Sequence, residues 1–212
     1  MLVTSLATAP PGAADTFEWP GATPRDLSLA NEILVLTRDA LARLVPGLRP
    51  LGHVPVRVVV SDAPQVAGSS YVLPLREVRI ERRFVNRMNL AHEATHALLH
   101  GRLATDPPVW LDEAAAQLVA YRVVHVADLA PPPGRPVGDF AALRALRGAS
   151  WAAAGGAAYA ESARWLGYLL PTGPATDEEK AAFASYVARL ARGDGADAAD
   201  AELAPIDRLA IR

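Results

Sequence analysis

Two histidines and a glutamate form the run His92-Glu93-Ala94-Thr95-His96, which has the spacing H-E-x-x-H. On an α-helix, residues four apart are rotated by about 40° and separated by about 6 Å along the axis, so both imidazoles can bind one metal ion. Glu93 leaves the same turn at a different angle, from which it can reach a water on the metal rather than the metal itself. The run therefore predicts a zinc clamp with Glu93 as the general base.

The residues around this run favour a helix. Apolar residues recur at helical spacing between positions 90 and 98, and Gly101 offers a C-terminal stop. The competing interpretation is a core helix that happens to carry two histidines. A buried and unpaired Glu93 beside two imidazoles would be costly without a cation, which disfavours that interpretation.

A catalytic zinc ion usually has three protein ligands and an open fourth position, so the sequence must supply a further ligand. His100 lies about 12 Å along the helix axis from His92, too far to share an ion bound at about 2 Å. The metzincin pattern requires Gly and His at two downstream positions where this sequence has Leu and Arg. What remains is an acidic residue on the helix expected over residues 106–121, which contains Asp112 and Glu113.

These two segments resemble the gluzincin branch of H-E-x-x-H metallopeptidases, and most closely the small peptidase MA-like domains. Such domains carry H-E-x-T-H on one helix and, after a short loop, a Pro-x-Trp-Leu-x-Glu-Gly-x-Ala segment. The matching stretches here are HEATH at 92–96 and PVWLDEAAA at 108–116, in which Ala114 replaces the customary Gly. The resemblance extends over residues near 54 to 171, and it implies that His92, His96 and Glu113 bind zinc.

The activity that the resemblance implies is zinc-dependent hydrolysis of a peptide or protein substrate. Zinc lowers the pKa of its water from near 16 towards about 7, and Glu93 is expected to take the proton as the hydroxide attacks the carbonyl. The rival function is a zinc-binding interaction domain that keeps the metal site without hydrolysing peptides, and a metal-free scaffold is a third. Glu93 disfavours the interaction domain, because a structural zinc ion needs no base and usually has four protein ligands.

Further residues are expected to support the reaction. Similar enzymes place a Tyr or His from a later helix against the developing oxyanion, which makes Tyr159 the expected donor here. A packing role for Tyr159 is equally open, and Tyr121 and Tyr168 are weaker candidates. Asp112 and Gln117 are expected to orient the zinc ligands. Asp112 can instead interact with the positive end of the helix dipole at the N-terminus of its own helix.

Composition agrees with a folded, soluble enzyme. The 212 residues can bury one core, and 21 basic against 23 acidic residues give a net charge of −2, which does not suggest a nucleic-acid partner. Cysteine is absent, so no disulfide is expected and the zinc site must be built from His and Glu.

No stretch approaches the roughly 18 apolar residues of a membrane span. Residues 1–9 are a weak hint of a trimmed export segment, since no Lys or Arg precedes their apolar run. The sequence carries no signal of oligomeric state.

The order of elements predicts an α+β fold, with a small β-sheet packed on a mostly helical body and the metal site between two adjacent helices. By the resemblance this architecture is zincin-like. The domain is expected over 26–192, between a flexible lead-in at 1–25 and a loosely held tail at 193–212. Helices are expected over 26–44, 139–147, 157–170 and 177–192, strands over 55–61, 70–73 and 78–84, and a stiff loop over 131–136. The basic stretch 76–83 alternates apolar and charged residues, which predicts an edge strand with a charged face.

Overall fold

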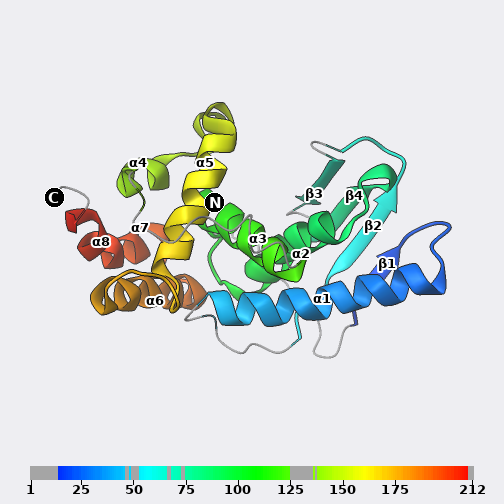
Figure 1. Ribbon diagram of the computed structural model, residues 1–212, viewed down its shortest axis with the longest axis horizontal. Helices are drawn as coiled ribbons and strands as arrows, with labels where there is room; N and C mark the ends of the chain where they lie inside the picture. The colour runs from blue at the N-terminus through cyan, green and yellow to red at the C-terminus, as the bar shows by residue number, and fades with distance from the viewer. Residues whose placement is uncertain are drawn as a thin grey trace, which may run out of the picture.

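The structure is a computed structural model that describes residues 14–45, 48, 53–65, 68–72, 75–124, 136 and 138–209. Its elements are β1 (Thr16–Glu18), α1 (Pro24–Leu44), β2 (Arg57–Ser61), β3 (Ser69–Val72), β4 (Glu77–Glu81), η3 (Arg82–Phe84), α2 (Arg87–Arg102), α3 (Val109–Val123), α4 (Phe140–Ala145), α5 (Gly148–Leu169), α6 (Asp177–Arg192), α7 (Ala196–Asp200), η5 (Ala201–Leu203) and α8 (Ala204–Leu209). Figure 1 shows the sheet at one end, α4 to α8 at the other, and α2 and α3 between them. The prediction of a small sheet on a mostly helical body is confirmed.

The four described strands form one mixed sheet in the order β1-β2-β4-β3. β1, β2 and β4 run parallel, and β3 pairs with β4 in the antiparallel direction. The prediction that residues 76–83 form an edge strand is therefore wrong, because β4 lies between β2 and β3. Its buried Glu77 is neutralised by Arg57 from β2 and by Arg79, whose Nη2 lies 3.0 Å from Oε2 of Glu77. This pairing lets a highly charged strand occupy the interior of the sheet.

The segment before α1 is part of the fold from residue 14 onward. Asp15 accepts hydrogen bonds from the backbone N–H of Val56 at 2.8 Å and from Arg38 at 2.6 Å, which fixes β1 beside β2. α1 begins at Pro24, because Thr23 and Asp26 form a reciprocal capping box. The expected flexible lead-in therefore does not extend over residues 14–25, and its first thirteen residues lie outside the described ranges.

The segment after α6 is also packed rather than loosely held. Leu203 and Ile206 are fully buried against the helical body. Arg144 of α4 contacts Asp200 at 3.2 Å and Asp207 at 2.5 Å. Asp200 and Asp207 are thus partners of a buried arginine, and the two apolar side chains supply the contact with the core.

α4 and α6 match the expected segments closely, whereas α7 and α8 lie where no helix was expected and α5 differs from its expected range. This helix begins at Gly148, nine residues earlier than expected, and is interrupted at Gly155, whose φ of 51° and ψ of −139° are not helical. The stiff loop expected at 131–136 lies outside the described residues apart from Pro136. Across the described ranges, every helix is too short or too polar to cross a membrane.

α2 and α3 pack against each other at the centre of the molecule, and both are buried on most sides. Ala114, Ala115 and Ala116 have no exposed surface, and side chains this small let the two helices approach closely. α2 continues to Arg102, so Gly101 is not its C-terminal stop. A Cβ at Gly101 would lie 2.4 Å from Cγ1 of Val54, so the glycine is required by close packing instead.

Candidate metal centre

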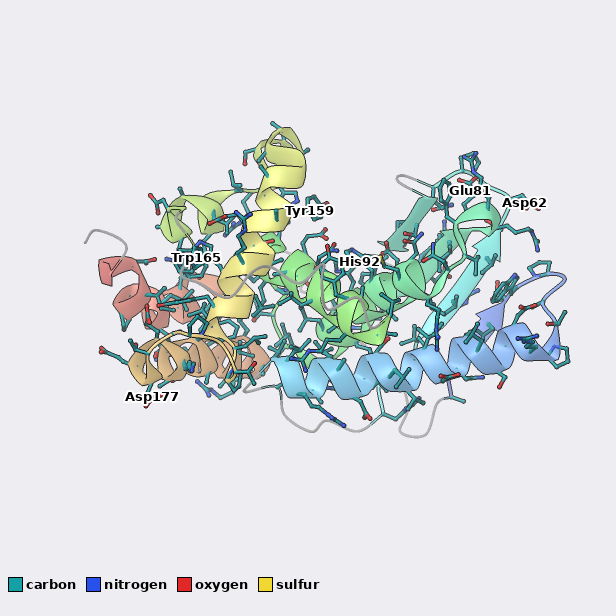
Figure 2. The ribbon with its side chains drawn as sticks, viewed as in Figure 1. Asp62, Glu81, His92, Tyr159, Trp165 and Asp177 are labelled. Atoms are coloured by element: carbon teal, nitrogen blue, oxygen red, sulfur yellow. The ribbon has the colours of Figure 1, made fainter. Side chains whose placement is uncertain are left out.

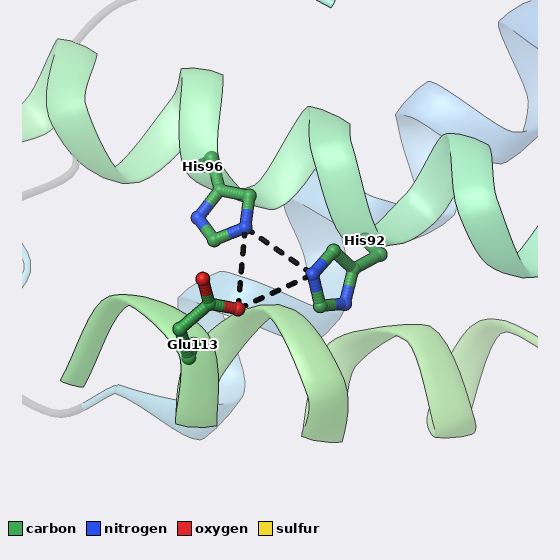
Figure 3. A group of neighbouring side chains, drawn as sticks. All are labelled: His92, His96 and Glu113. Carbon is green, nitrogen blue, oxygen red and sulfur yellow. Dashed lines mark hydrogen bonds and ion pairs between the residues drawn. The ribbon is translucent and has the colours of Figure 1, made fainter. Parts of the chain in front are cut away.

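Three side chains from α2 and α3 point at one another (Figure 3), and they are His92, His96 and Glu113. Nε2 of His92 lies 3.3 Å from Nε2 of His96. Oε2 of Glu113 lies 3.5 Å from the first of these nitrogens and 3.7 Å from the second. A zinc ion that binds its ligands tetrahedrally at about 2 Å places the ligand atoms about 3.3 Å apart. The spacing of these three atoms therefore fits such an ion.

The chemistry of the three donors agrees with their spacing. Oε2 of Glu113 is buried and accepts no hydrogen bond from the described residues. A buried carboxylate oxygen without a hydrogen-bond donor is costly, and a cation shared with two imidazoles would remove that cost. Two imidazole nitrogens and one carboxylate oxygen also form the ligand set of several catalytic zinc sites. These residues could hold a metal ion on both counts.

Asp112 lies on α3, and its carboxylate contacts two histidines of α2. Its Oδ1 lies 2.8 Å from Nδ1 of His96, on the side of the ring away from the shared point, and its Oδ2 lies 3.1 Å from Nε2 of His100. Burial alone would lower the pKa of His96, but the charges of Asp112 and Glu113 outweigh it and raise this pKa to about 9. Burial would raise the pKa of Asp112, but His96 and His100 hold it well below its usual range. Asp112 thus stays ionised beside His96, in a position from which it could orient that imidazole.

Glu93 is buried on α2 and faces the same cavity as the three ligand candidates. Its Oε1 accepts a hydrogen bond of 2.9 Å from Oγ of Ser69, which lies on β3. Sequence reasoning missed Ser69. A strand was expected close to this position, but no motif indicates which of its hydroxyl groups would meet a residue on a distant helix.

Tyr159 reaches the site from α5, as the labelled side chain in Figure 2 shows. Its hydroxyl donates a long hydrogen bond of 3.5 Å to Oε1 of Glu113. Its ring packs edge-on against Trp151, with the ring centroids 5.3 Å apart. Burial and the charge of Glu113 raise the pKa of Tyr159, so the phenol keeps its proton at neutral pH. Tyr168 donates to the buried Glu179 at 2.8 Å, and neither it nor Tyr121 lines the cavity.

The cavity has a volume of about 680 Å³ and lies over the ligand candidates. Its wall combines residues of four elements with the loop before α3, and they are Ser69, Ser70, Tyr71, Met88, Asn89, His92, Glu93, His96, His100, Asp106, Pro107, Val109, Asp112, Glu113, Gln117 and Tyr159. The ring of Tyr71 stacks on that of His96, with their centroids 6.4 Å apart. It is tilted against the ring of His100, whose centroid lies 5.3 Å away. The expected ligands, base, ligand-orienting residues and oxyanion donor thus line one space.

Comparison of the chain with protein-family models, with curated proteins and with solved structures gives no match. A functional assignment therefore depends on the residues and on the geometry of this site.

Proposed function

We propose that this chain is a zinc-dependent peptidase of zincin-like architecture, in which His92, His96 and Glu113 bind the metal and Glu93 is the general base. The observation that carries the proposal is the meeting of three ligand atoms at 3.3 to 3.7 Å from one another. The carboxylate of Glu93 opens onto the same cavity. A purely structural zinc site has no use for such a base, and usually has four protein ligands.

Zinc at this site would supply a water of pKa about 7 and a positive charge that polarises the substrate carbonyl. Ser69 donates to Oε1 of Glu93, so Oε2 is the oxygen left to accept a proton from water. Glu93 then returns that proton to the leaving amine, which makes it both base and acid within one turnover. Tyr159 is assigned as the donor to the oxygen of the attacked carbonyl, since its phenol is protonated beside Glu113.

The edge of the sheet supports a peptide as the substrate. Among the described strands, β3 pairs only with β4, so its other edge is open to a further strand. Ser69, Ser70 and Tyr71 of β3 line the cavity beside Glu93. An extended peptide that adds to such an edge is held by main-chain hydrogen bonds, which places its carbonyl groups along the strand.

A single substitution separates zinc binding from hydrolysis. Glu93→Gln keeps the size of the side chain and an acceptor for Ser69, but it removes the base. We expect this variant to retain its zinc while cleavage of a peptide library falls by about a hundredfold or more. Glu178→Gln, at an exposed position of α6, is the matched control and should keep both properties.

The outcomes of this experiment distinguish the candidate functions. Wild-type cleavage that stops with a chelator and returns with zinc supports the proposal. Full activity of Glu93→Gln contradicts the assigned mechanism. A zinc-loaded wild type that cleaves no peptide in a broad library favours the zinc-binding interaction domain instead.

A further inference from the structure

His100 lies one turn beyond His96 on α2, and the mechanism proposed above gives it no role. Its side chain is only 8% exposed. Nε2 lies 3.1 Å from Oδ2 of Asp112, and Nδ1 lies 3.3 Å from Oδ1 of Asp106. Both ring nitrogens therefore face carboxylate oxygens, and the ring of Tyr71 covers one side.

Asp112 is shared between two histidines, each of which faces a different oxygen. Oδ1 lies 2.8 Å from Nδ1 of His96, and Oδ2 lies 3.1 Å from Nε2 of His100. A carboxylate whose two oxygens contact different partners cannot rotate about its Cβ–Cγ bond without losing at least one of those contacts. If the partner at His100 is removed, Oδ2 keeps no other hydrogen-bond donor among the contacts of the described residues. The orientation of Asp112 then depends on His96 alone.

We infer that His100 is a positioning residue of the metal centre, which holds Asp112 against Nδ1 of His96 and so directs Nε2 of His96 towards the ion. The inference rests on the proposed zinc binding. An acceptor at Nδ1 keeps the proton on that nitrogen and leaves the lone pair of Nε2 free for a metal. Loss of such an outer partner typically weakens metal binding by about ten- to a hundredfold. His100 acts through Asp112, so the lower end of this range applies.

A packing role for His100 predicts a different pattern of variants. If His100 only fills space beside Tyr71, the size of the replacement decides the effect and the position of a donor does not. If His100 positions Asp112, a donor at the place of Nε2 is required. Gln can put its amide N–H near that place, whereas the shorter Asn ends near Nδ1 and cannot reach Asp112.

The experiment measures the affinity of the protein for zinc by competition with a chromophoric chelator. Wild type is compared with His100→Gln, His100→Asn and His100→Leu, with His53→Leu as the control for loss of a histidine outside the cavity. We expect zinc binding to weaken about tenfold in His100→Asn and His100→Leu, and to stay within about threefold of wild type in His100→Gln and His53→Leu. The visible spectrum of the cobalt-substituted protein should change in the same two variants, because it reports the arrangement of the ligands.

Equal zinc affinity in His100→Asn and His100→Gln overturns the positioning role, because only the Gln amide reaches Asp112. Equal affinity in His100→Leu and wild type does the same. A wild type that binds no zinc at all contradicts the proposed function, and this inference with it. Thermal midpoints of the zinc-free variants identify any replacement that fails to fold, and the comparison of Asn with Gln remains if His100→Leu is lost.

Discussion

The side chain of Tyr159 has one contact that suits catalysis and one that suits packing. Its hydroxyl lies 3.5 Å from Glu113, while its ring meets the buried Trp151. At 36% exposure the tyrosine is open to a ligand in the cavity. These contacts can be separated, because the hydroxyl and the ring are removed by different substitutions.

Tyr159→Phe removes the donor and keeps the ring. If the hydroxyl stabilises the oxyanion, kcat should fall by about ten- to a thousandfold with little change in KM, since the interaction is made mainly in the transition state. The thermal midpoint should stay close to that of wild type. Steady-state kinetics and thermal unfolding of the variant provide both measurements.

Tyr159→Ala is the companion variant. It removes the contact with Trp151 as well, so stability should fall together with activity. Full activity in Tyr159→Phe would exclude a catalytic role and leave Tyr159 as a packing residue.

At this scale, the sequence identifies residues that follow a fixed local spacing. His92, Glu93 and His96 are set by one helical turn, so their arrangement could be predicted before any fold was known. Ser69 reaches Glu93 from a strand 24 positions away, and no local spacing encodes that meeting. His100 was set aside as a ligand on helix geometry, and its link to Asp112 depends on how α2 and α3 pack, which only the fold provides.

Among the elements, the approach of α2 to its neighbours controls where the ligand candidates lie. Ala114, Ala115 and Ala116 are fully buried on α3, on the same turns as Glu113. On the other side of α2, Gly101 packs directly against Val54, which precedes β2. The position of α2 is therefore set on two sides by residues that carry little or no side chain.

Gly101→Ala tests this packing. The new methyl group would lie 2.4 Å from Cγ1 of Val54, so α2 or the chain before β2 must shift, at a cost of about 1 to 3 kcal/mol of unfolding free energy. Gly167→Ala in α5 is the matched control, because a Cβ there meets nothing within 4 Å. The control should be stabilised by about 0.5 to 1 kcal/mol from helix propensity alone. Urea unfolding of both variants measures the difference, and equal stability of the two would contradict the close approach.

The positions of the strands could be predicted from the sequence, but their order in the sheet could not. The approximate positions of β2, β3 and β4 follow from β-branched runs and alternating polarity, and they were predicted from these patterns. The order of the strands depends on which charges pair across the sheet. Glu77 is neutralised by an arginine 20 positions earlier, so β4 is interior although its sequence resembles an edge strand.

For the whole molecule, a buried cation is among the groups that join the C-terminal helices to the helical body. Arg144 contacts Asp200 and Asp207, and its guanidinium lies 5.0 Å from the ring centre of Phe140. These contacts connect α4 with α7 and α8, which are about 60 residues further along the chain. The division of the chain into a domain and a tail at residue 193 stays a prediction, but the residues after 193 contribute to the core.

Arg144→Met should lower the unfolding free energy by about 2 kcal/mol, because it leaves two carboxylates without their cation. The loss is smaller than for a fully buried pair, since Asp200 and Asp207 are partly exposed. Arg43→Met is the control, because Arg43 and Asp39 form an exposed pair at 3.9 Å whose loss should cost less than about 0.5 kcal/mol. Urea denaturation compares the two, and an Arg144 variant as stable as the Arg43 variant would show that the contacts of Arg144 add nothing to the attachment of the C-terminal helices.

The central claim is that one zinc ion binds where α2 meets α3, and the zinc content of the purified protein tests it most directly. Mass spectrometry of metal content should give about one zinc per wild-type chain, and far less in His92→Ala, His96→Ala and Glu113→Ala. His53→Ala, outside the cavity, should keep the wild-type content. If the three ligand variants keep a full load of zinc, or the wild type takes up none, the claim is contradicted.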